Sequence, residues 1–385
     1  MLSLPFGFTI FQYIGLWQPL HWNSKLTIKL YQFYSCFAIT FLYTNVLSEI
    51  IELFRAYENF EIFINNLVVF LSMFGCSIKA ASVLNQRAGL VKLIMTLSSH
   101  PCFPEDQNEE LIQQKFDKTI HTRTILYVSV TGMTASLVAV IAFFTDGVRY
   151  VLPFQAWLPF DISHPIKYWI AYTHQNIAHL MGAAINAAYD TVIPGLMLQI
   201  CAQFSILKHR LSIISETVQS KDYKSNDINK KEAECFANHV KHHLQIFQFA
   251  ETLNGVFGFV FLIQFTISAT VICVTVYSMS KLDLGSSDLT PMTMYLTCML
   301  YQLFLFCYAG SEVITKSSEI AEAVHTIRWY LLNNSSHKGL LVMMLRSLKP
   351  IKFTTGHVIE LSMESYTQVV KLSYSVYNVL KQSSE

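Results

Sequence analysis

The sequence predicts an all-α polytopic membrane protein with seven transmembrane helices, cytoplasmic helical extensions, a cytoplasmic amino terminus and an external carboxy terminus. Three observations lead to this fold class. Of the 385 residues, 52% are hydrophobic and only 14% are charged, whereas a soluble domain carries about 25% charged residues. Apolar segments long enough to cross a bilayer recur along the chain. Lysine and arginine gather in alternate connections, as expected when cytoplasmic and external loops alternate.

The first segment, MLSLPFGFTIFQYIGLWQP at 1–19, is apolar but is interrupted by Pro5 and Gly15. It has no basic start and no small-residue cleavage site, so it differs from a signal peptide. We expect an amphipathic segment that lies against the membrane surface, with the first true span acting as the insertion signal.

Seven segments have the length and apolar character of a membrane-spanning helix, which needs about 20 residues. They are residues 31–53, 63–84, 123–145, 174–204, 252–278, 292–313 and 353–380. A shorter helical pattern at 317–332 precedes the last span and is too polar to cross a membrane alone. The long connections at 85–122 and 205–251 also have helical periodicity, so several spans should continue as helices below the membrane.

The distribution of basic residues predicts the orientation. The amino-terminal segment and the second, fourth and sixth connections together hold 20 lysines and arginines, while the other three connections hold four. Because cytoplasmic connections carry an excess of basic residues, the amino terminus is expected inside. This orientation is opposite to that of G-protein-coupled receptors and argues against that class. The external connection at 146–173 is rich in aromatic residues, which indicates either a lid or an aromatic belt at the head groups.

The last expected span carries a polar stripe. At 100° per residue, seven polar side chains share one face of a helix. They are Glu360, Glu364, Thr367, Lys371, Ser375, Asn378 and Gln382. Exposing such a stripe to lipid is costly. It should therefore either hydrogen-bond to neighbouring helices or line an aqueous path shared with other subunits, because one helix cannot enclose a pore.

Several blocks of the sequence are recognisable. Three near the carboxy terminus are QLFLFCYAGSEV at 302–313, SSEIAEAVHTIRWYLL at 317–332 and LLVMMLRSLKPIKFTTGHVIELSMESYTQVVKLSYSVYNVL at 340–380. Further blocks are GLWQP at 15–19, AAYDTVIPGLMLQICAQFSILKHRL at 187–211 and HHLQIFQFAETLN at 242–254. With these segments the chain resembles the seven-helix insect odorant receptor family over its whole length. It departs from the family pattern at Phe306 and at Val376 and Tyr377.

The resemblance implies an odorant receptor subunit in the plasma membrane of olfactory sensory neurons, which binds small volatile apolar ligands and gates a non-selective cation channel. The implied partners are co-receptor subunits, in a hetero-oligomer expected to be a tetramer whose last spans surround a pore. The chain then divides into a seven-helix receptor body with an outer ligand pocket and cytoplasmic anchor helices, residues 1–350, and a pore-lining final helix, residues 351–385. A gustatory-type receptor channel of the same superfamily is the alternative, although it would lack the SYS sequence at 373–375.

The pore gate is expected in the last turns of the final helix. The resemblance points to Tyr377 and Leu380 as the constriction, whereas the polar stripe favours Tyr374 and Asn378; Lys381 belongs to the same segment. The alternative for Tyr377 is that its side chain packs between subunits.

The ligand pocket implied by the resemblance lies in the outer half of the membrane, between spans two, three, four and six. A site for small apolar ligands is mostly hydrophobic with few polar groups. Gly132 would leave space, and the flexible side chains of Met73 and Met181 suit varied ligands, although each candidate could instead serve ordinary helix packing. The candidates are Val69, Phe70, Met73, Phe74, Ser129, Gly132, Ser136, Ala178, Met181, Ile185, Tyr295, Cys298 and Met299.

Other classes of function find little support. Cys235, His239 and His243 recur every four residues, but the first and last would lie about 12 Å apart along a helix, too far to share one metal ion. The net charge of +1 argues against a nucleic-acid partner. No catalytic constellation, nucleotide-binding loop or inverted repeat of a carrier is visible, so we expect no enzyme activity, no cofactor and no metal.

Two charged residues, Lys79 and Asp190, fall inside the second and fourth spans. Ionisable residues within a membrane usually pair or line a wet cavity. Each lies 16 positions from the start of its span, or roughly 24 Å along the helix, so an ion pair near the cytoplasmic end is possible. Alternatively, Lys79 extends to the inner head groups while Asp190 joins a local polar network.

Overall fold

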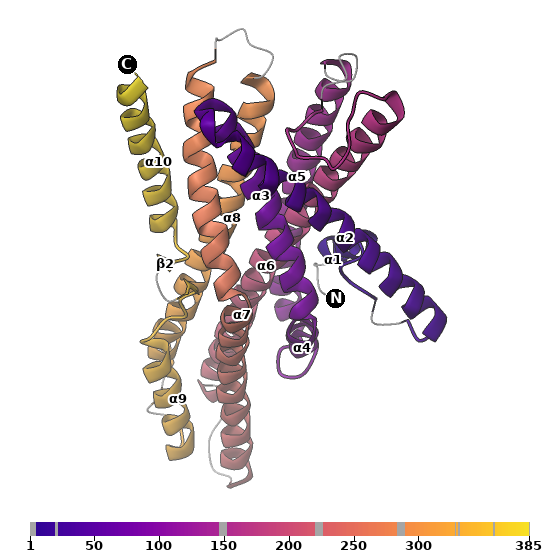
Figure 1. The fold of residues 1–385 in the computed structure, drawn as a ribbon. Coiled ribbons are helices and arrows are strands. Elements are labelled where there is room, and N and C mark those ends of the chain that lie inside the picture. Colours follow the sequence, from indigo (N-terminus) through magenta and orange to yellow (C-terminus); the bar gives the residue numbers. More distant parts are fainter. Residues whose placement is uncertain are drawn as a thin grey trace.

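The structure is a computed structural model that describes residues 5–19, 22–145, 152–219, 226–282, 289–327, 329, 332–356 and 359–384. Long helices dominate it (Figure 1). They are α1 Pro5–Tyr13, α2 Lys25–Arg55, α3 Phe60–Asn85, α4 Arg87–Leu97, α5 Gln107–Thr145, α6 Pro165–Gln219, α7 Asn226–Ser280, α8 Leu289–Thr326, α9 Asn334–Ser347 and α10 Met363–Ser384. A 3-10 turn, η1 Ala56–Glu58, follows α2, and an antiparallel pair, β1 Thr354–Thr355 and β2 Ile359–Glu360, precedes α10. The predicted all-α fold class is confirmed.

Six described helices are long and apolar enough to cross a membrane, namely α2, α3, α5, α6, α7 and α8. They coincide with the first six predicted spans. The seventh, α10, is more polar, but its 22 residues are long enough for the bilayer core at 1.5 Å per residue.

Several spans extend well beyond the thickness of a bilayer, as the periodicity of the long connections predicted. Helices α6 and α7 have 55 residues each, although about 20 suffice to cross a membrane. Their lower halves run together, with α9 beside them, away from the membrane-spanning part (Figure 1). The extra turns therefore form a helical bundle outside the bilayer.

Two predictions near the carboxy terminus are wrong in detail. Residues 317–332 do not form a separate short helix, because α8 continues without interruption to Thr326; no proline or glycine breaks the segment. The last span does not begin at 353, because the chain first makes the β1–β2 hairpin and α10 starts only at Met363. Gly356 adopts a positive φ of 55° in this hairpin, a backbone conformation that glycine adopts without steric cost.

The amino-terminal segment is helical, but it packs within the bundle instead of only lying against the membrane surface. Phe11, Leu16 and Trp17 are buried, and α1 contacts α6. A side chain at Gly7 would collide with Val192 of α6, so the glycine permits this close approach.

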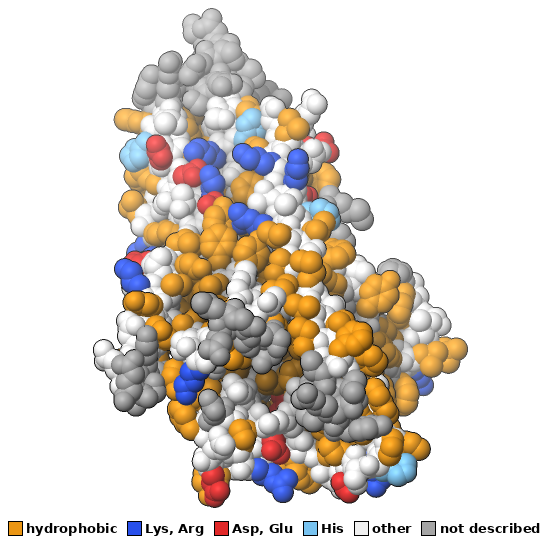
Figure 2. Space-filling view, turned by 90° about the horizontal axis from the view of Figure 1, so that it is seen from above, with side chains coloured by type: hydrophobic (Ala, Val, Ile, Leu, Met, Phe, Trp, Pro, Cys, Tyr) orange, Lys and Arg blue, Asp and Glu red, His pale blue; other side chains and the backbone are white. Residues whose placement is uncertain are grey.

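Helix α6 occupies the centre of the protein. It contacts α1, α2, α3, α5, α7 and α8. In its most apolar stretch of 18 residues, 94% of the residues are buried, compared with 17% in the corresponding stretch of α5. On the face shown in Figure 2, hydrophobic side chains gather over the middle, while most charged side chains lie nearer two opposite edges. A broad apolar surface of this kind suits contact with lipid.

Candidate functional site

The four helices expected to enclose the ligand pocket are joined by polar contacts in their outer halves. The Ser72 hydroxyl of α3 lies 2.5 Å from the Tyr295 hydroxyl of α8. The Thr134 hydroxyl of α5 lies 3.4 Å from the Cys298 thiol of α8. These two contacts link α3 and α5 to α8 through polar side chains.

Nine of the thirteen predicted pocket residues face the interior of this region. The buried ones are Met73, Ala178, Ile185, Cys298 and Met299, and the half-buried ones are Val69, Phe70, Met181 and Tyr295. Most of them belong to one continuous hydrophobic cluster. Their shared position suits a pocket lining, and ligand contact stays a prediction.

The candidates on α5 do not face the interior of this region. The structure places three candidates on the exposed side of this helix, namely Ser129, Gly132 and Ser136. Tyr127 and Thr134 occupy the buried side instead. Phe74 of α3 is also exposed, with its ring stacked on that of Phe70 at 5.5 Å between centroids.

Gly182 of α6 is a further residue of this region that the sequence did not reveal. A Cβ atom at Gly182 would lie 2.8 Å from the Met73 sulfur, so any side chain there would displace the methionine. The Cys76 thiol donates a hydrogen bond of 3.3 Å to the Gly182 carbonyl. The missing side chain therefore lets α3 approach α6 closely.

Below this region, Lys79 and Asp190 form a buried ion pair. The lysine Nζ lies 2.7 Å from Asp190 Oδ1 and 2.9 Å from Oδ2, and the two side chains are 1% and 0% exposed. Lys79 also donates to the Asn186 side-chain oxygen at 2.7 Å. Of the two alternatives that the sequence left open, the ion pair is correct.

Asp190 has further partners that complete a network across four helices. The Gln302 amide of α8 donates to Oδ2, and the Tyr127 hydroxyl of α5 lies 3.5 Å from the same atom. A cavity of about 10 Å³ beside Asp190, also lined by Arg123 and Thr124, has room for about one water molecule. The network thus joins α3, α5, α6 and α8 at one level.

The external segment after α5 folds back onto the bundle. The Phe154 ring stacks on His179 of α6 with centroids 3.8 Å apart, and the Gln175 amide donates to the Phe154 carbonyl at 3.0 Å. The Trp157 amide donates to the Ser48 carbonyl of α2 at 3.1 Å. Within the described residues 152–164, these contacts favour a lid over a simple aromatic belt.

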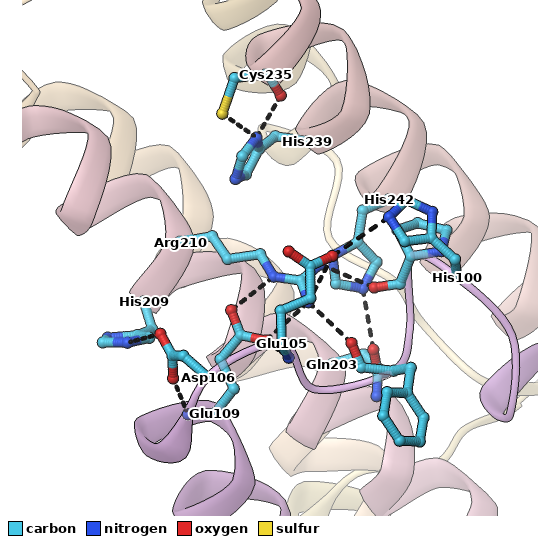
Figure 3. A network of polar contacts seen from close by, with 12 residues as sticks. His100, Glu105, Asp106, Glu109, Gln203, His209, Arg210, Cys235, His239 and His242 are labelled. Carbon is cyan, nitrogen blue, oxygen red and sulfur yellow. Dashed lines mark hydrogen bonds and ion pairs between the residues drawn. The ribbon is translucent and has the colours of Figure 1, made fainter. Parts of the chain in front are cut away.

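A second polar network lies in the lower bundle (Figure 3). The buried Arg210 of α6 makes two hydrogen bonds of 2.8 and 2.7 Å to the Glu109 carboxylate at the start of α5. Its guanidinium also donates to the carbonyls of Pro101 and Phe103, at 2.7 and 3.0 Å. One arginine therefore fixes the whole connection between α4 and α5.

His242 of α7 belongs to the same network. Its Nδ1 lies 3.3 Å from Arg210 Nη1, and its Nε2 lies 2.9 Å from the Gln203 side-chain oxygen. A neutral imidazole fits both contacts, because Nδ1 accepts from the guanidinium while Nε2–H donates to the amide oxygen. Burial and the charge of Arg210 lower the pKa of His242 to about 3.

The cysteine and histidines of α7 do not converge on a metal site. The His239 ring donates from Nδ1 to the Cys235 carbonyl at 2.5 Å, while His243 Nε2 lies 3.4 Å from the Ser347 hydroxyl of α9. Within the described residues, no three histidine, cysteine or acidic side chains are grouped so that they could hold a metal ion.

Comparison with known proteins decides the family. A model of the 7tm Odorant receptor family matches residues 59–374. The chain belongs to the odorant receptor family. The gustatory alternative is therefore set aside, and the receptor is not an enzyme.

Similar proteins agree with this assignment. The receptor is 22% identical to Odorant receptor 46a, isoform B, of Drosophila melanogaster over 96% of each chain. It is 26% identical to Odorant receptor Or1 of Anopheles gambiae over 60% of each chain. The structure of olfactory receptor OR5 from Machilis hrabei in complex with eugenol matches with a TM-score of 0.83 and 17% identity, over 99% of this chain and 97% of that one. The seven-helix membrane fold is thus confirmed.

The final helix of the receptor stands at the side of the bundle (Figure 1), where it contacts α7 and α8. Its buried side holds Ser365, Val369 and Ser373. The polar stripe is on the other side, with exposed members Glu364, Thr367, Lys371, Ser375 and Gln382. Glu360 does not belong to the stripe, because it lies in β2. There its carboxylate Oε2 forms an ion pair with Lys352 Nζ at 2.9 Å.

The predicted gate residues differ in their surroundings. Tyr374 is exposed, and Tyr377 and Asn378 are half-buried; the two tyrosine rings lie 6.2 Å apart between centroids. The side chains of Leu380 and Lys381 are outside the described residues. The gate itself stays a prediction.

Proposed function

We propose that this odorant receptor is one subunit of an odorant-gated, non-selective cation channel that assembles with the family's co-receptor into a tetramer. In this proposal, residues 1–350 form the receptor body, and residues 351–385 carry the pore-lining helix. The proposed location is the plasma membrane of olfactory sensory neurons, where small volatile apolar molecules would reach the external side.

The exposed polar stripe of α10 carries this proposal. Glu364, Thr367 and Lys371 point away from the bundle, although α10 is the seventh membrane helix. A charged side chain facing lipid costs at least about 2.5 kcal/mol near the bilayer centre, whereas water in a pore would solvate it. A single helix cannot enclose water, so the stripe favours assembly of several copies around a common path.

Recording currents over an odorant panel, with and without the co-receptor, tests the proposal. We expect odorant-evoked cation current when both subunits are expressed, and weak or absent current when this subunit is expressed alone. Ligand responses that pass only through G-protein second messengers, with no current, would contradict it.

We propose that odorants bind among the inward-facing residues of α3, α6 and α8, beneath the external segment. Met73 and Met181 lie in an apolar region with few polar groups, which suits small apolar ligands. The hydroxyl pair of Ser72 and Tyr295 would offer the ligand a polar contact from α3 and α8.

The proposed pocket and gate can be separated by mutation. Met181→Ala should change the ranking of active odorants and leave ion preference unchanged, because the residue belongs to α6 whereas α10 packs on α7 and α8. Tyr377→Ala should change conduction, ion preference or resting leak, with the ranking preserved. If Tyr377→Ala altered only the ranking, this division of roles would be wrong.

A further inference from the structure

A groove of about 490 Å³ lies between α4 and α7, on the side of the protein opposite the external segment. Helix α4 lies beside the lower half of α7 (Figure 1). In the orientation predicted from the basic residues, this groove opens to the cytoplasm directly below the inner leaflet. Neither the proposed pocket nor the proposed pore includes it.

The lining of the groove has an amphipathic and basic character. Lys92 of α4 and Lys241 of α7 are both exposed and line the groove near its two ends. Lys92 is at the Thr252 end, because Gly89 of α4 lies against Val256 of α7. The apolar part includes the buried Leu93 and Phe249 and the exposed Leu244. Among the described residues, none of those that line the groove is acidic.

Neither lysine has a counter-charge among the residues that the structure describes. Within the described residues, no ion pair joins either ammonium group to a carboxylate. His100, at one end of the groove, does pair with a carboxylate, the Glu105 side chain at 3.2 Å. Two unpaired cations facing one groove favour an anionic occupant.

The length of the groove narrows the choice of anion. Its α7 side runs from Thr252, where the predicted span begins, down to Lys241, which is about 16 Å at 1.5 Å per residue. The head-group layer on each side of a bilayer is only about 5–8 Å thick. The phosphate of an ordinary phospholipid would therefore remain near Thr252 and would not reach Lys241.

We propose that this groove binds the head group of an inner-leaflet inositol phospholipid that carries phosphates on its ring. The glycerol phosphate would lie beside Thr252 and Lys92, and the ring phosphates would extend toward Lys241. Basic pockets at the cytoplasmic side of membrane helices suit such head groups. The lipid would then bridge α4 and α7 below the membrane.

Titration of the purified full-length receptor with a short-chain phosphatidylinositol bisphosphate, followed by native mass spectrometry, tests this proposal. Short-chain phosphatidylserine and phosphatidylcholine serve as comparison lipids. We expect the bisphosphate to bind more tightly than either. Each lysine near an anionic lipid contributes about fivefold in affinity, so Lys92→Gln with Lys241→Gln should weaken binding about 30-fold.

A matched control separates the groove from general surface charge. Lys115 and Lys118 of α5 are also exposed, on the same side of the membrane, and Lys115→Gln with Lys118→Gln removes the same charge outside the groove. This control should bind the bisphosphate like the wild type. Equal weakening in both double variants, equal affinity for phosphatidylserine, or no binding would each overturn the proposal.

A second measurement asks what covers the groove in a cell membrane. Lys92 and Lys241 should be protected from amine acylation in native membranes and become reactive after treatment with an inositol-lipid phosphatase. Protection that persists after this treatment would show that another protein chain covers the groove, and the proposal would fail.

Discussion

Removal of one partner from the buried Lys79–Asp190 pair should destabilise the receptor strongly. The charged atoms lie 2.7 Å apart, a separation at which unit charges attract by about 6 kcal/mol at an effective dielectric constant of 20. The two side chains are 1% and 0% exposed, so a charge left alone would be hydrated by at most about one water molecule in the small cavity beside Asp190. Breaking such a pair from one side costs about 3–5 kcal/mol, which we expect for both Lys79→Met and Asp190→Asn.

Removing both charges together should cost much less. In Lys79→Met with Asp190→Leu, no unpaired charge remains, and replacing a whole buried pair with apolar side chains is often neutral. We therefore expect the double variant to be more stable than either single variant. The residual loss should come from Asn186 and Gln302, which each lose a hydrogen-bond partner.

Thermal unfolding of the purified receptor measures these effects, with the exposed Lys118→Gln as a control that should match the wild type. Single variants within about 0.5 kcal/mol of the wild type, the usual range of surface substitutions, would refute the reasoning. The reasoning would also be refuted if the double variant lost as much unfolding free energy as the two single variants together, because the losses of independent sites add.

Three further expectations follow from other parts of the structure. Lowering the pH from 7.5 to 5 should reduce the free energy of unfolding by about 2 kcal/mol through His242. The unfolded histidine binds a proton near pH 6.5, whereas the folded one, with its pKa at about 3, stays neutral. This part of the loss should be absent from melting curves of His242→Gln. Gly310→Ala should lower the melting temperature, since its Cβ would collide with the Leu361 carbonyl, whereas Gly255→Ala, with open space around it, should not. Asn333, which begins a glycosylation sequon on the predicted cytoplasmic side, should show no glycosidase-sensitive gel shift, and a shift would reverse the orientation.

The sequence was sufficient for the first six spans, and it named the pairing of Lys79 with Asp190 as one of two alternatives that the structure then decided. Both results depend on lengths and on the cost of burying polar groups, which are properties of single segments. Because the two charged residues lie at equal depth in their spans, they are at the same level of the membrane. The apolar surroundings disfavour an unpaired charge, so each charge is expected to have a partner there. The partners Tyr127, Asn186 and Gln302 were not predicted, because polar residues of this size can also face outward or bond within their own helix.

The face of α5 could not be predicted from the sequence. Its apolar residues surround the helix, with exposed Leu126, Met133 and Phe143, because one side packs on α6 and the other is suited to lipid. Apolar periodicity separates core from solvent, but it does not separate core from lipid. Ser129 and Ser136 were chosen by their depth in the third span, which the resemblance implied, and depth alone does not give the face of a helix; they lie on the exposed side.

The start of the last helix illustrates a different limit. Residues 353–362 are apolar enough to extend a span, yet tertiary contacts hold them as a hairpin. The Leu361 amide donates to the Phe353 carbonyl at 2.8 Å, and the Met363 amide donates to the Ser311 hydroxyl of α8 at 2.9 Å. These contacts join residues that are distant in sequence, so no local pattern could reveal them.

The packing of α10 on α8 also offers a route between the proposed ligand site and the proposed pore-lining helix. Tyr295 and Gln302 lie on the same continuous helix as Gly310 and Ser311, and the last two hold the start of α10 through Leu361 and the Met363 amide. The distance from Tyr295 to Gly310 is fifteen residues, about 22 Å along the axis. A shift of α8 that accommodates a ligand beside Tyr295 must therefore either bend the helix within that distance or move the base of α10. Because no proline lies between these residues, we expect α8 to move as a rod.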